Sequence, residues 1–533
     1  MIVSIKTKIQ EALNSIIRAS IHLMKTMEIS LSPSLLLASL VLLLFTWLHM
    51  RSASPRKNTN GHGRRISSPP SRPVVGHLHL LKKPLHHSLA ALARRYGGGS
   101  GLLLLRFGAQ PVLLVSSPAV ADECFTVHDV ALADRPRLFS RRLLTDDCPS
   151  IANARYGPLW RQLRRLATVH ALCAHRLAAT AATRDAEASA VAAKLWRAGP
   201  GAVSVKATAY EFVVNVIMAM VAGERMPEEQ VLRFKEITEA AFAAAGAANR
   251  QDFLPVLRLL DFGRTAKRLT SLAKARHQFG QSLVDEYRRR HPRGCATEET
   301  PRTVIGDLLR QQQQSPQSLD DVVIRTVCLS LLQAGTDTSS STIEWAMALL
   351  LNNPAVLKKA TAELDSVVGT SRLLRESDLA GLPYLRCVIA ETLRLKPLAP
   401  HLVPHEASRD CVIAGHAVAR GTMVLVDVYS MQRDPDMWED PEEFTPERFM
   451  DAPAKRQWTM PFGMGRRKCP GEGLALRTVG MALGVMLQCF EWQRVGEEEV
   501  DMSEGSGLSM PMAEPLVAVC RPRSEMKSVL ETL

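Results

Sequence analysis

One ten-residue loop constrains this chain more than any other segment. The loop runs from Phe462 to Gly471, reads Phe-Gly-Met-Gly-Arg-Arg-Lys-Cys-Pro-Gly, and leads into an apolar, helix-like stretch. Its glycines, among them Gly463 and Gly465, leave the main chain uncovered, so that a flat macrocycle can approach it closely. A thiolate held in such a turn is what axial ligation of haem iron by cysteine requires. The loop therefore predicts that Cys469 is a ligand of haem iron.

A structural cysteine in a glycine-rich loop is the alternative, because free cysteines are usually buried and inert. The spacing favours haem, since the pattern Phe-x-x-Gly-x-Arg-x-Cys-x-Gly has five fixed positions and all five are filled. The matching residues are Phe462, Gly465, Arg467, Cys469 and Gly471. The loop resembles the haem-binding signature of cytochrome P-450 monooxygenases. This resemblance implies haem b, iron protoporphyrin IX, as the cofactor, with Phe462, Gly463 and Gly471 beside it.

The resemblance extends along residues 65–523 and implies a mainly α fold with a small β part. No long linker divides the chain beyond residue 90, and 46% hydrophobic residues suffice for one large core. Short apolar runs at 102–105 and 112–115 predict strands. Alanine-rich tracts at 171–193 and 240–248 predict helices. We therefore expect a single haem-thiolate monooxygenase domain over residues 77–533.

Basic residues gather near the N-terminus. The net charge is +13, and ten Lys or Arg residues but no Asp or Glu occur between Arg51 and Arg95. A basic stretch beside an apolar segment is typical of a membrane anchor rather than of nucleic-acid binding. The apolar segment runs from Leu31 to Met50, about the length that crosses a bilayer. We predict a single-pass anchor at 31–50, a cytosolic catalytic domain and no nucleic-acid partner, and the resemblance implies that the membrane is that of the endoplasmic reticulum.

A cleaved signal peptide is the competing interpretation of this apolar segment, because its central run is short. Arg51 follows it immediately, however, and no small-residue cleavage site is present. Residues 1–30 are an N-terminal extension whose apolar residues recur at helical spacing between basic ones, so it could form an amphipathic helix or part of a transit peptide. The simpler explanation, which we favour, is that translation begins at Met27. Residues 51–76 form a basic, proline-rich hinge, whose closely spaced prolines predict an extended, stiff spacer.

A polar motif interrupts the apolar, helical run at 322–351. It reads Ala-Gly-Thr-Asp-Thr-Ser from Ala334 onward, and such residues loosen a helix interior. Conflicts of this kind often mark functional sites, although a simple helix kink is the alternative. By resemblance, Thr338 is the catalytic hydroxyl that delivers protons and Asp337 is its acidic partner. The resemblance also implies that Gly335 opens the groove in which oxygen sits.

Glu391 and Arg394 lie three residues apart, so that they face one another on a helix. A second arginine, Arg448, occurs in the segment Phe-Thr-Pro-Glu-Arg-Phe and can share the same carboxylate. An isolated Glu-x-x-Arg carries no weight, but this combination resembles the Glu-Arg-Arg triad of the family. We expect these three residues to be scaffold rather than chemistry.

Haem carries two propionates, which require cationic or donor partners in a closed pocket. Trp160 and Arg164 lie four residues apart and therefore share one helix face. The resemblance implies that these two residues bind the propionates together with Arg467 and His405. An ordinary loop histidine is the alternative for His405.

No glycine-rich dinucleotide fingerprint occurs in the chain. The resemblance implies that electrons come from NADPH through a separate, membrane-bound cytochrome P-450 reductase, while the protein supplies ligand, protons and pocket. Two other classes stay open: a reductase-independent haem-thiolate isomerase or dehydratase, and a non-catalytic haem-binding protein. The intact pair of Asp337 and Thr338 argues against an isomerase or dehydratase. A non-catalytic protein would tolerate substitutions in the oxygen-groove motif, and this sequence shows none.

Phrases elsewhere in the chain resemble plant A-type enzymes of this family, most nearly family 81. They are Gly76 to His86, Thr342 to Met347 and Gly507 to Pro511. Members of family 81 hydroxylate aromatic secondary metabolites such as isoflavones, lignans and indole glucosinolates, and some detoxify herbicides. The resemblance therefore implies monooxygenation of a small aromatic substrate. The segments expected to line the pocket are 139–152, 332–334, 398–403 and 508–510.

Four further positions carry weaker expectations. Arg466 and Lys468 form a basic surface that could meet an acidic reductase, although solvation alone also explains it. His401 stands where related sequences carry an apolar residue; it could contact a phenol, but we favour a side chain that points into solvent. Lys396 stands where an aromatic residue is common, and the sequence assigns it no role.

Overall fold

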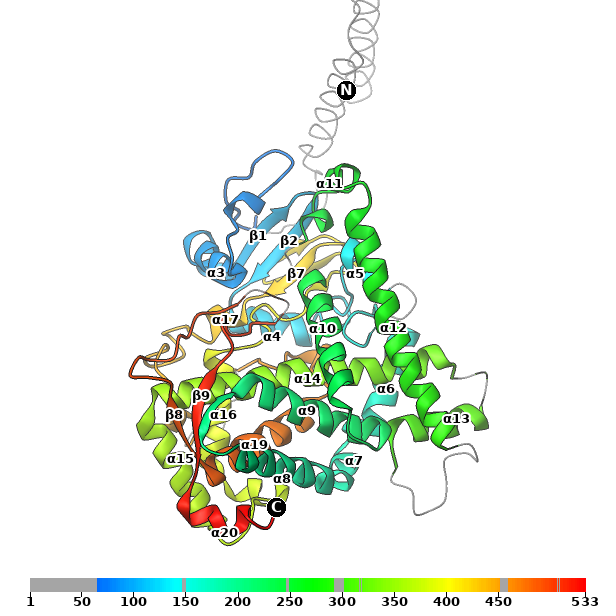
Figure 1. The fold of residues 1–533 in the computed structure, drawn as a ribbon. Coiled ribbons are helices and arrows are strands. Elements are labelled where there is room, and N and C mark those ends of the chain that lie inside the picture. Colours follow the sequence, from blue (N-terminus) through cyan, green and yellow to red (C-terminus); the bar gives the residue numbers. More distant parts are fainter. Residues whose placement is uncertain are drawn as a thin grey trace, which may run out of the picture. The chain divides into compact units, whose positions relative to one another are not determined.

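The computed structural model describes residues 65–145, 150–245, 249–291, 302–315, 317, 319–450, 459–505, 507 and 509–533. Helices make up most of these residues, and the strands form three small sheets (Figure 1). The expected mainly α fold with a small β part is confirmed. The extension at 1–30, the predicted anchor at 31–50 and the hinge up to residue 64 lie outside the described residues.

The largest sheet has the strand order β1-β2-β7-β4. Figure 1 shows β1, β2 and β7 side by side. Its strands are β1 (Leu102–Phe107), β2 (Gln110–Val115), β7 (Met423–Val426) and β4 (His405–Glu406). β1 and β2 are antiparallel, with Leu102 opposite Val115, which confirms the two strands predicted from the apolar runs. The turn between them needs Gly108, whose φ is +55°, because a Cβ atom there would collide with the Phe253 carbonyl. Helix α3 (Leu85–Tyr96) packs buried leucines against this sheet.

The end of the predicted hinge also packs against β1. The Leu104 N–H donates to Ser67 O at 2.9 Å, and the His77 N–H donates to Arg106 O at 2.7 Å. Gly76 has a φ of +60°, and a Cβ atom there would collide with the Arg106 carbonyl. The compact domain therefore begins near Ser67, earlier than the boundary at residue 77 that the sequence suggests.

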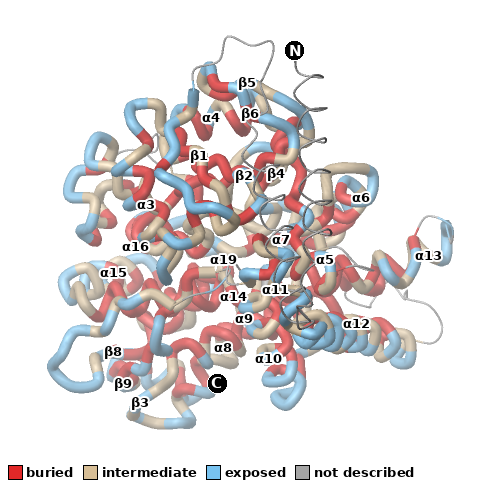
Figure 2. The backbone as a smooth tube through the Cα atoms, turned by 90° about the horizontal axis from the view of Figure 1, so that it is seen from above, coloured by how far each residue is buried: buried red, intermediate tan, exposed pale blue. Residues whose placement is uncertain are grey.

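Among the described residues the longest helix is α14 (Asp321–Asn352), which confirms the predicted helical run. Its 32 residues span about 48 Å, and the Asp320 side chain caps it by accepting from the Val323 N–H at 2.8 Å. The helices that pack against it include α6 (Pro158–Ala167), α9 (Val205–Ala222), α12 (Arg264–Arg290), α16 (Pro383–Leu395) and α19 (Glu472–Cys489). Most of α14 and α9 is buried (Figure 2). These helices form the centre of the core.

Helix α9 is long and apolar enough to cross a membrane, and no other helix of the described residues meets that test. Most of its residues are buried inside the protein, against α14 and α8 (Ala181–Ala198). Burial in the core therefore accounts for its apolar composition.

Shorter elements complete the fold. The remaining helices are α4 (Pro118–Thr126), α5 (Phe139–Thr145), α7 (Ala174–Ala179), α10 (Glu228–Ala245), α11 (Val256–Leu260), α13 (Val304–Gln314), α15 (Pro354–Val367), α17 (Val428–Met431) and α20 (Lys527–Leu530). β3 (Gly201–Ser204), β9 (Val517–Pro522) and β8 (Phe490–Arg494) form one sheet, and β5 (Cys411–Ile413) pairs with β6 (His416–Val418). The first alanine-rich tract lies mainly in α7 and α8, and the described part of the second ends α10.

Candidate functional site

The cysteine loop, residues 462–471, is closed by its own backbone. The Cys469 N–H donates to Phe462 O at 2.8 Å. Gly463 and Gly465 have φ values of +70° and +64°, which residues with a side chain rarely adopt. A Cβ atom on Gly465 would also lie 2.6 Å from Asp129 Oδ1. The glycines are therefore required by the turn itself and by its packing.

Cys469 is an accessible thiol in a protein-rich environment. Its side chain is exposed, yet enough protein surrounds it that burial raises the pKa of the thiol above its ordinary value. The Gly471 N–H, Arg164 and Lys468 oppose this rise in pKa. An accessible sulfur can bind a metal ion, and coordination would deprotonate it outright.

Ile151 connects three of the predicted site segments. Its carbonyl oxygen accepts from Trp160 Nε1 at 3.1 Å and from Arg467 Nη1 at 3.3 Å. Its N–H donates to Ser330 Oγ of α14 at 3.3 Å. The Arg467 guanidinium also lies 4.5 Å from the centre of the Trp160 ring. Helix α6, the cysteine loop and α14 therefore meet at this residue, which belongs to the expected pocket segment 139–152.

Four arginines lie around this junction. They are Arg135, Arg141, Arg164 and Arg467. Burial lowers the pKa of Arg141 and of Arg467 to about 10, and it lowers the pKa of Arg135 and Arg164 as well. Within the described residues none of the four forms an ion pair, and Arg141 Nε and Nη1 have no hydrogen-bond partner. Unpaired buried cations are costly, so these residues fit a ligand that carries two carboxylates, as haem does.

Arg135 and Arg141 are not among the site residues predicted from the sequence. Arg135 donates from Nε to Ala152 O at 2.9 Å and from Nη1 to Val403 O at 2.7 Å, so it joins two of the expected pocket segments. Neither arginine stands in a diagnostic spacing. The available signal was only that they lie in an arginine-rich stretch at 135–142.

His405 is buried beside these arginines. Its Nδ1 lies 2.7 Å from Leu132 O, which identifies Nδ1–H as the donor. Burial and the neighbouring Arg135 hold the pKa of His405 well below its ordinary value. In the neutral ring Nε2 is an acceptor, so His405 could donate to a propionate only as imidazolium. A bound anion would favour that form, because a nearby negative charge raises the pKa of histidine.

The accessible face of α14 carries Ala334 and Thr338. The helix is mostly buried over 326–351, whereas Ala334 is exposed and Thr338 is half-buried. Thr338 Oγ1 donates to Ala334 O at 2.7 Å. Gly335 faces α9 instead, because a Cβ atom there would lie 2.6 Å from Ile217 Cδ1. The missing side chain of Gly335 gives room to Ile217 of α9, and the expected role of Gly335 in an oxygen groove stays a prediction.

Asp337 belongs to a buried polar cluster on another face of α14. Ser509 Oγ donates to Asp337 Oδ2 at 2.9 Å, and Lys206 Nζ lies 3.9 Å from Asp337 Oδ1. Lys206 also donates to Ser341 Oγ and lies 3.7 Å from Glu344 Oε2. Lys206 and Glu344 are not among the site residues predicted from the sequence, although a lysine at the start of an apolar helix is a signal. Ser509 lies in an expected pocket segment.

The structure brings together Glu391, Arg394 and Arg448. Arg394 Nε donates to Glu391 Oε2 at 2.7 Å, and Arg448 Nε donates to Glu391 Oε1 at 2.9 Å. Glu391 and Arg394 are completely buried. Arg394 Nη1 also donates to the carbonyl oxygens of Gln432 and Pro441. Because each charge is paired and hydrogen-bonded, the triad fastens α16 to the segment that follows residue 432.

Arg466 and Lys468 are already paired within the domain. Arg466 Nε lies 2.7 Å from Asp129 Oδ2, and Lys468 Nζ lies 2.7 Å from Glu472 Oε2. These carboxylates offset much of the local positive charge. The expectation that the two residues offer a basic docking surface is therefore weakened.

His401 does not point into solvent, contrary to the expectation. Its side chain is only 11% exposed, and Nε2 lies 4.0 Å from Asp427 Oδ1, which is too far for a hydrogen bond. Burial, with a smaller contribution from His86, lowers the pKa of His401 to about 3. The ring is therefore neutral at physiological pH.

Comparisons with known proteins place these features in context. The family model for cytochrome P-450 matches residues 66–519. The chain is 42% identical to cytochrome P-450 81Q32 of Catharanthus roseus over 88% of this chain and 94% of the relative. It is 41% identical to the (+)-piperitol/(+)-sesamin synthase of Sesamum radiatum, over 89% and 94%. It is 38% identical to an isoflavone 2'-hydroxylase of Medicago truncatula, over 87% and 93%.

Proposed function

The chain belongs to the cytochrome P-450 family, with relatives in plant family 81, and we propose that it inserts one oxygen atom from O2 into a small aromatic substrate. One observation carries this proposal: Cys469 is an accessible thiol in a glycine-dependent turn, and Arg164 lies near enough to act on its charge. That arrangement suits a ligand which presents iron to sulfur and carboxylates to arginine.

Haem, when bound, supplies the oxidative chemistry, and Cys469 would be its axial ligand. The propionates would be held by the arginines without ion pairs, which are Arg135, Arg141, Arg164 and Arg467. The unpartnered Nε and Nη1 atoms of Arg141 support this assignment. Trp160, whose indole N–H is already bonded to Ile151, would hold Arg467 in place rather than contact a propionate.

Proton delivery is proposed for Thr338 and Asp337. Thr338 lies on the accessible face of α14, and rotation of its hydroxyl away from Ala334 O would direct its proton toward that face. Asp337 is one residue away but is held by Ser509 on a different face. We infer that Asp337 passes protons to Thr338 through small movements of its carboxylate, which lies 3.9 Å from Lys206 Nζ.

The substrate class is proposed from the relatives and from the pocket segments. Two relatives are described as an isoflavone hydroxylase and as a (+)-piperitol/(+)-sesamin synthase, which act on aromatic compounds. In this chain the segments expected at the pocket are joined, since the Met510 N–H donates to Leu398 O at 3.0 Å. A small aromatic substrate bound between these segments would contact apolar side chains of the two segments.

The electrons are proposed to come from NADPH through a membrane-bound reductase.

The domain itself is proposed to contact the endoplasmic reticulum membrane. The predicted anchor supports the membrane location. So does the region around α11, where Leu259, Leu260 and Phe262 are 77%, 67% and 89% exposed. Three large apolar side chains within four residues form a patch suited to a lipid surface.

The test is reconstitution in phospholipid vesicles with a cytochrome P-450 reductase, NADPH, oxygen and an isoflavone or lignan. Binding is read first from the spin-state change of haem, and products are then identified by mass. We expect a product heavier by one oxygen atom, formed only when NADPH is present. Turnover of a hydroperoxide without NADPH would instead indicate an isomerase or dehydratase.

A further inference from the structure

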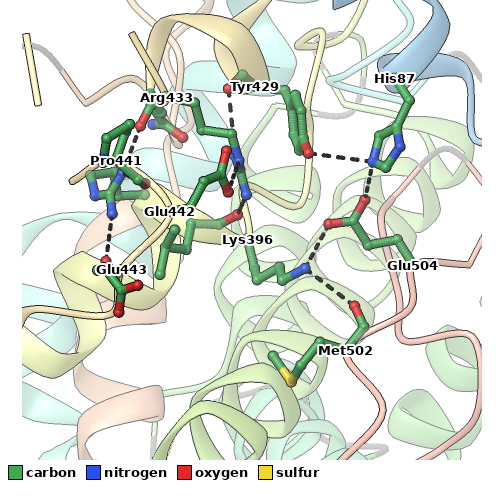
Figure 3. Close-up of polar contacts among 12 residues, drawn as sticks. His87, Lys396, Tyr429, Arg433, Pro441, Glu442, Glu443, Met502 and Glu504 are labelled. Atoms are coloured by element: carbon green, nitrogen blue, oxygen red, sulfur yellow. Dashed lines mark hydrogen bonds and ion pairs between the residues drawn. The ribbon is translucent and has the colours of Figure 1, made fainter. Parts of the chain in front are cut away.

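Three nitrogen atoms lie around the Glu504 carboxylate, and Figure 3 shows two of them, from Lys396 and His87. Lys396 Nζ lies 2.7 Å from Glu504 Oε1, so the residue without an assigned role in the sequence has a buried partner. His86 Nε2 and His87 Nε2 lie 2.5 Å and 2.9 Å from Glu504 Oε2. The histidines stand in the first turn of α3, whereas Glu504 lies in the segment between β8 and β9.

We propose that His86, His87 and Glu504, here named the His-His-Glu cluster, bind a divalent transition-metal ion, and that Zn²⁺ fits best. Two imidazole nitrogens and one carboxylate oxygen are a ligand set that Zn²⁺ favours, with water as the fourth ligand. The three ligand atoms lie within 4.8 Å of one another. None of these residues is proposed to hold haem or to move protons, so the metal site is independent of the proposed function.

The two separations between histidine and glutamate atoms need only small adjustments. Tetrahedral ligands at about 2.0–2.1 Å from Zn²⁺ lie about 3.3 Å from one another. The two nitrogen–oxygen separations of 2.5 and 2.9 Å would therefore widen by less than about 1 Å. The side chain of His87 is 52% exposed, whereas those of His86 and Glu504 are 5% exposed. An ion can thus enter from the solvent beside His87 while the other two ligands stay in place.

Neighbouring groups hold the carboxylate ready for a metal. Lys396 fixes Oε1 and is itself held by Met502 O at 3.3 Å and by the Trp345 ring at 4.5 Å. These contacts orient the carboxylate, as outer-shell partners do for metal ligands.

An ion pair without a metal is the competing explanation. Lys396 alone balances the charge of Glu504. A simple ion pair therefore explains the contact at Oε1, but it does not explain why two imidazoles contact Oε2. The Tyr429 hydroxyl lies 3.3 Å from His87 Nε2 and is a further oxygen at the open side of the cluster (Figure 3). A metal ion makes use of this surplus of ligand atoms, whereas an ion pair does not.

The cluster is connected to the proposed active site through one loop. The Gly505 N–H donates to Pro511 O at 2.8 Å, which closes the loop that follows Glu504. Ser509 in the same loop donates to Asp337 of α14. A metal ion that fastens Glu504 to α3 would therefore stiffen the segment that holds Asp337.

Zn²⁺ binding should be measured by isothermal titration on the haem-loaded full chain, so that Cys469 is not available as a ligand. His87→Ala is the informative variant, because His87 is exposed and its loss should leave the fold intact. His79→Ala is the matched control, since His79 is an exposed histidine in the same region outside the cluster. We expect one Zn²⁺ site in the wild type and in His79→Ala, weakened at least about tenfold in His87→Ala. Mg²⁺ should not compete, because it prefers oxygen ligands.

Hydrogen exchange provides a second readout that needs no activity. Zn²⁺ should protect peptides from α3 and from residues 498–505 in the wild type and in His79→Ala, but not in His87→Ala. Equal Zn²⁺ affinity in the wild type and His87→Ala would overturn the proposal. So would equal protection in these two proteins, or competition by Mg²⁺ at the same concentration.

Discussion

Thr338 and Asp337 are adjacent in sequence but lie on different faces of α14. Thr338 is accessible and bonded to a carbonyl of its own helix, whereas Asp337 is buried between Ser509 and Lys206. The two side chains therefore have different energetic roles. Loss of the Thr338 hydroxyl removes one back-bond of the helix, while loss of Asp337 leaves Lys206 without one of its two carboxylates.

Replacement of Thr338 by alanine should separate chemistry from stability. In Thr338→Ala we expect product formation to fall about 10²-fold, because general acid catalysis is lost, while NADPH consumption continues. Thr338→Ser should recover much of the loss. Thr342→Ala is the control, since Thr342 makes the same kind of back-bond one turn later, to Thr338 O at 2.9 Å. Equal product per NADPH in the wild type and Thr338→Ala would exclude Thr338 from proton delivery.

His401 should make the folded state sensitive to acid. Its pKa is about 3 in the folded protein and 6.5 in its ordinary environment, so folding favours the neutral ring. This stabilisation is complete above pH 6.5 and is lost as the pH falls toward 3. Between pH 7 and pH 5 the free energy of unfolding should fall by about 2 kcal/mol from this group alone. Denaturant unfolding of the wild type and His401→Leu checks this, because the variant should lose less stability; identical pH dependence would contradict it.

Among the secondary-structure elements, α16 depends on the triad at its C-terminal end. Glu391 lies on α16 and accepts from Arg394 of the same helix and from Arg448 of a distant segment. All hydrogen-bonding capacity of this carboxylate is directed to groups buried beside it, including the Thr445 N–H at 3.0 Å. The helix and the segment ahead of the cysteine loop are thus held by one side chain.

Glu391→Ala should leave two buried arginines without their carboxylate. We expect a loss of about 3–5 kcal/mol in the free energy of unfolding, together with poor haem retention. Glu442→Ala is the control, because Glu442 is 71% exposed and pairs with Arg433 at 3.2 Å. Thermal unfolding and haem content of purified proteins test this. If Glu391→Ala were as stable as the control, the triad would not be what holds α16 to the segment that follows residue 432.

Much of this arrangement could be predicted from local sequence, and some of it could not. The strands at 102–105 and 112–115 and the helix at 322–351 follow from apolar runs, and Cys469 stands in a pattern with five fixed positions. Arg135, Lys206 and Glu504 owe their roles to partners far away in the chain, which no local spacing reveals. The contact of Gly335 with Ile217 of α9 is likewise a tertiary contact that local sequence does not reveal.

For the whole molecule, the proposed membrane contact at α11 is open to a direct test in the full chain. Phe262→Trp places a fluorophore at a side chain that is 89% exposed, and Val495→Trp places one at a control position that is 58% exposed. In vesicles that contain brominated lipids, the added fluorescence of Phe262→Trp should be quenched and that of Val495→Trp should not. Equal quenching at both positions would contradict the proposed membrane contact at α11.

The proposed function depends most on the assignment of Cys469 as the thiolate ligand of haem. The measurement that tests it most directly is the absorption spectrum of the reduced protein with carbon monoxide. The wild type and Cys173→Ser should show the long-wavelength band of a thiolate-ligated haem. Cys469→His should retain haem through imidazole but lose that band. A wild-type protein without the band, or a Cys469→His variant that keeps it, would contradict the assignment.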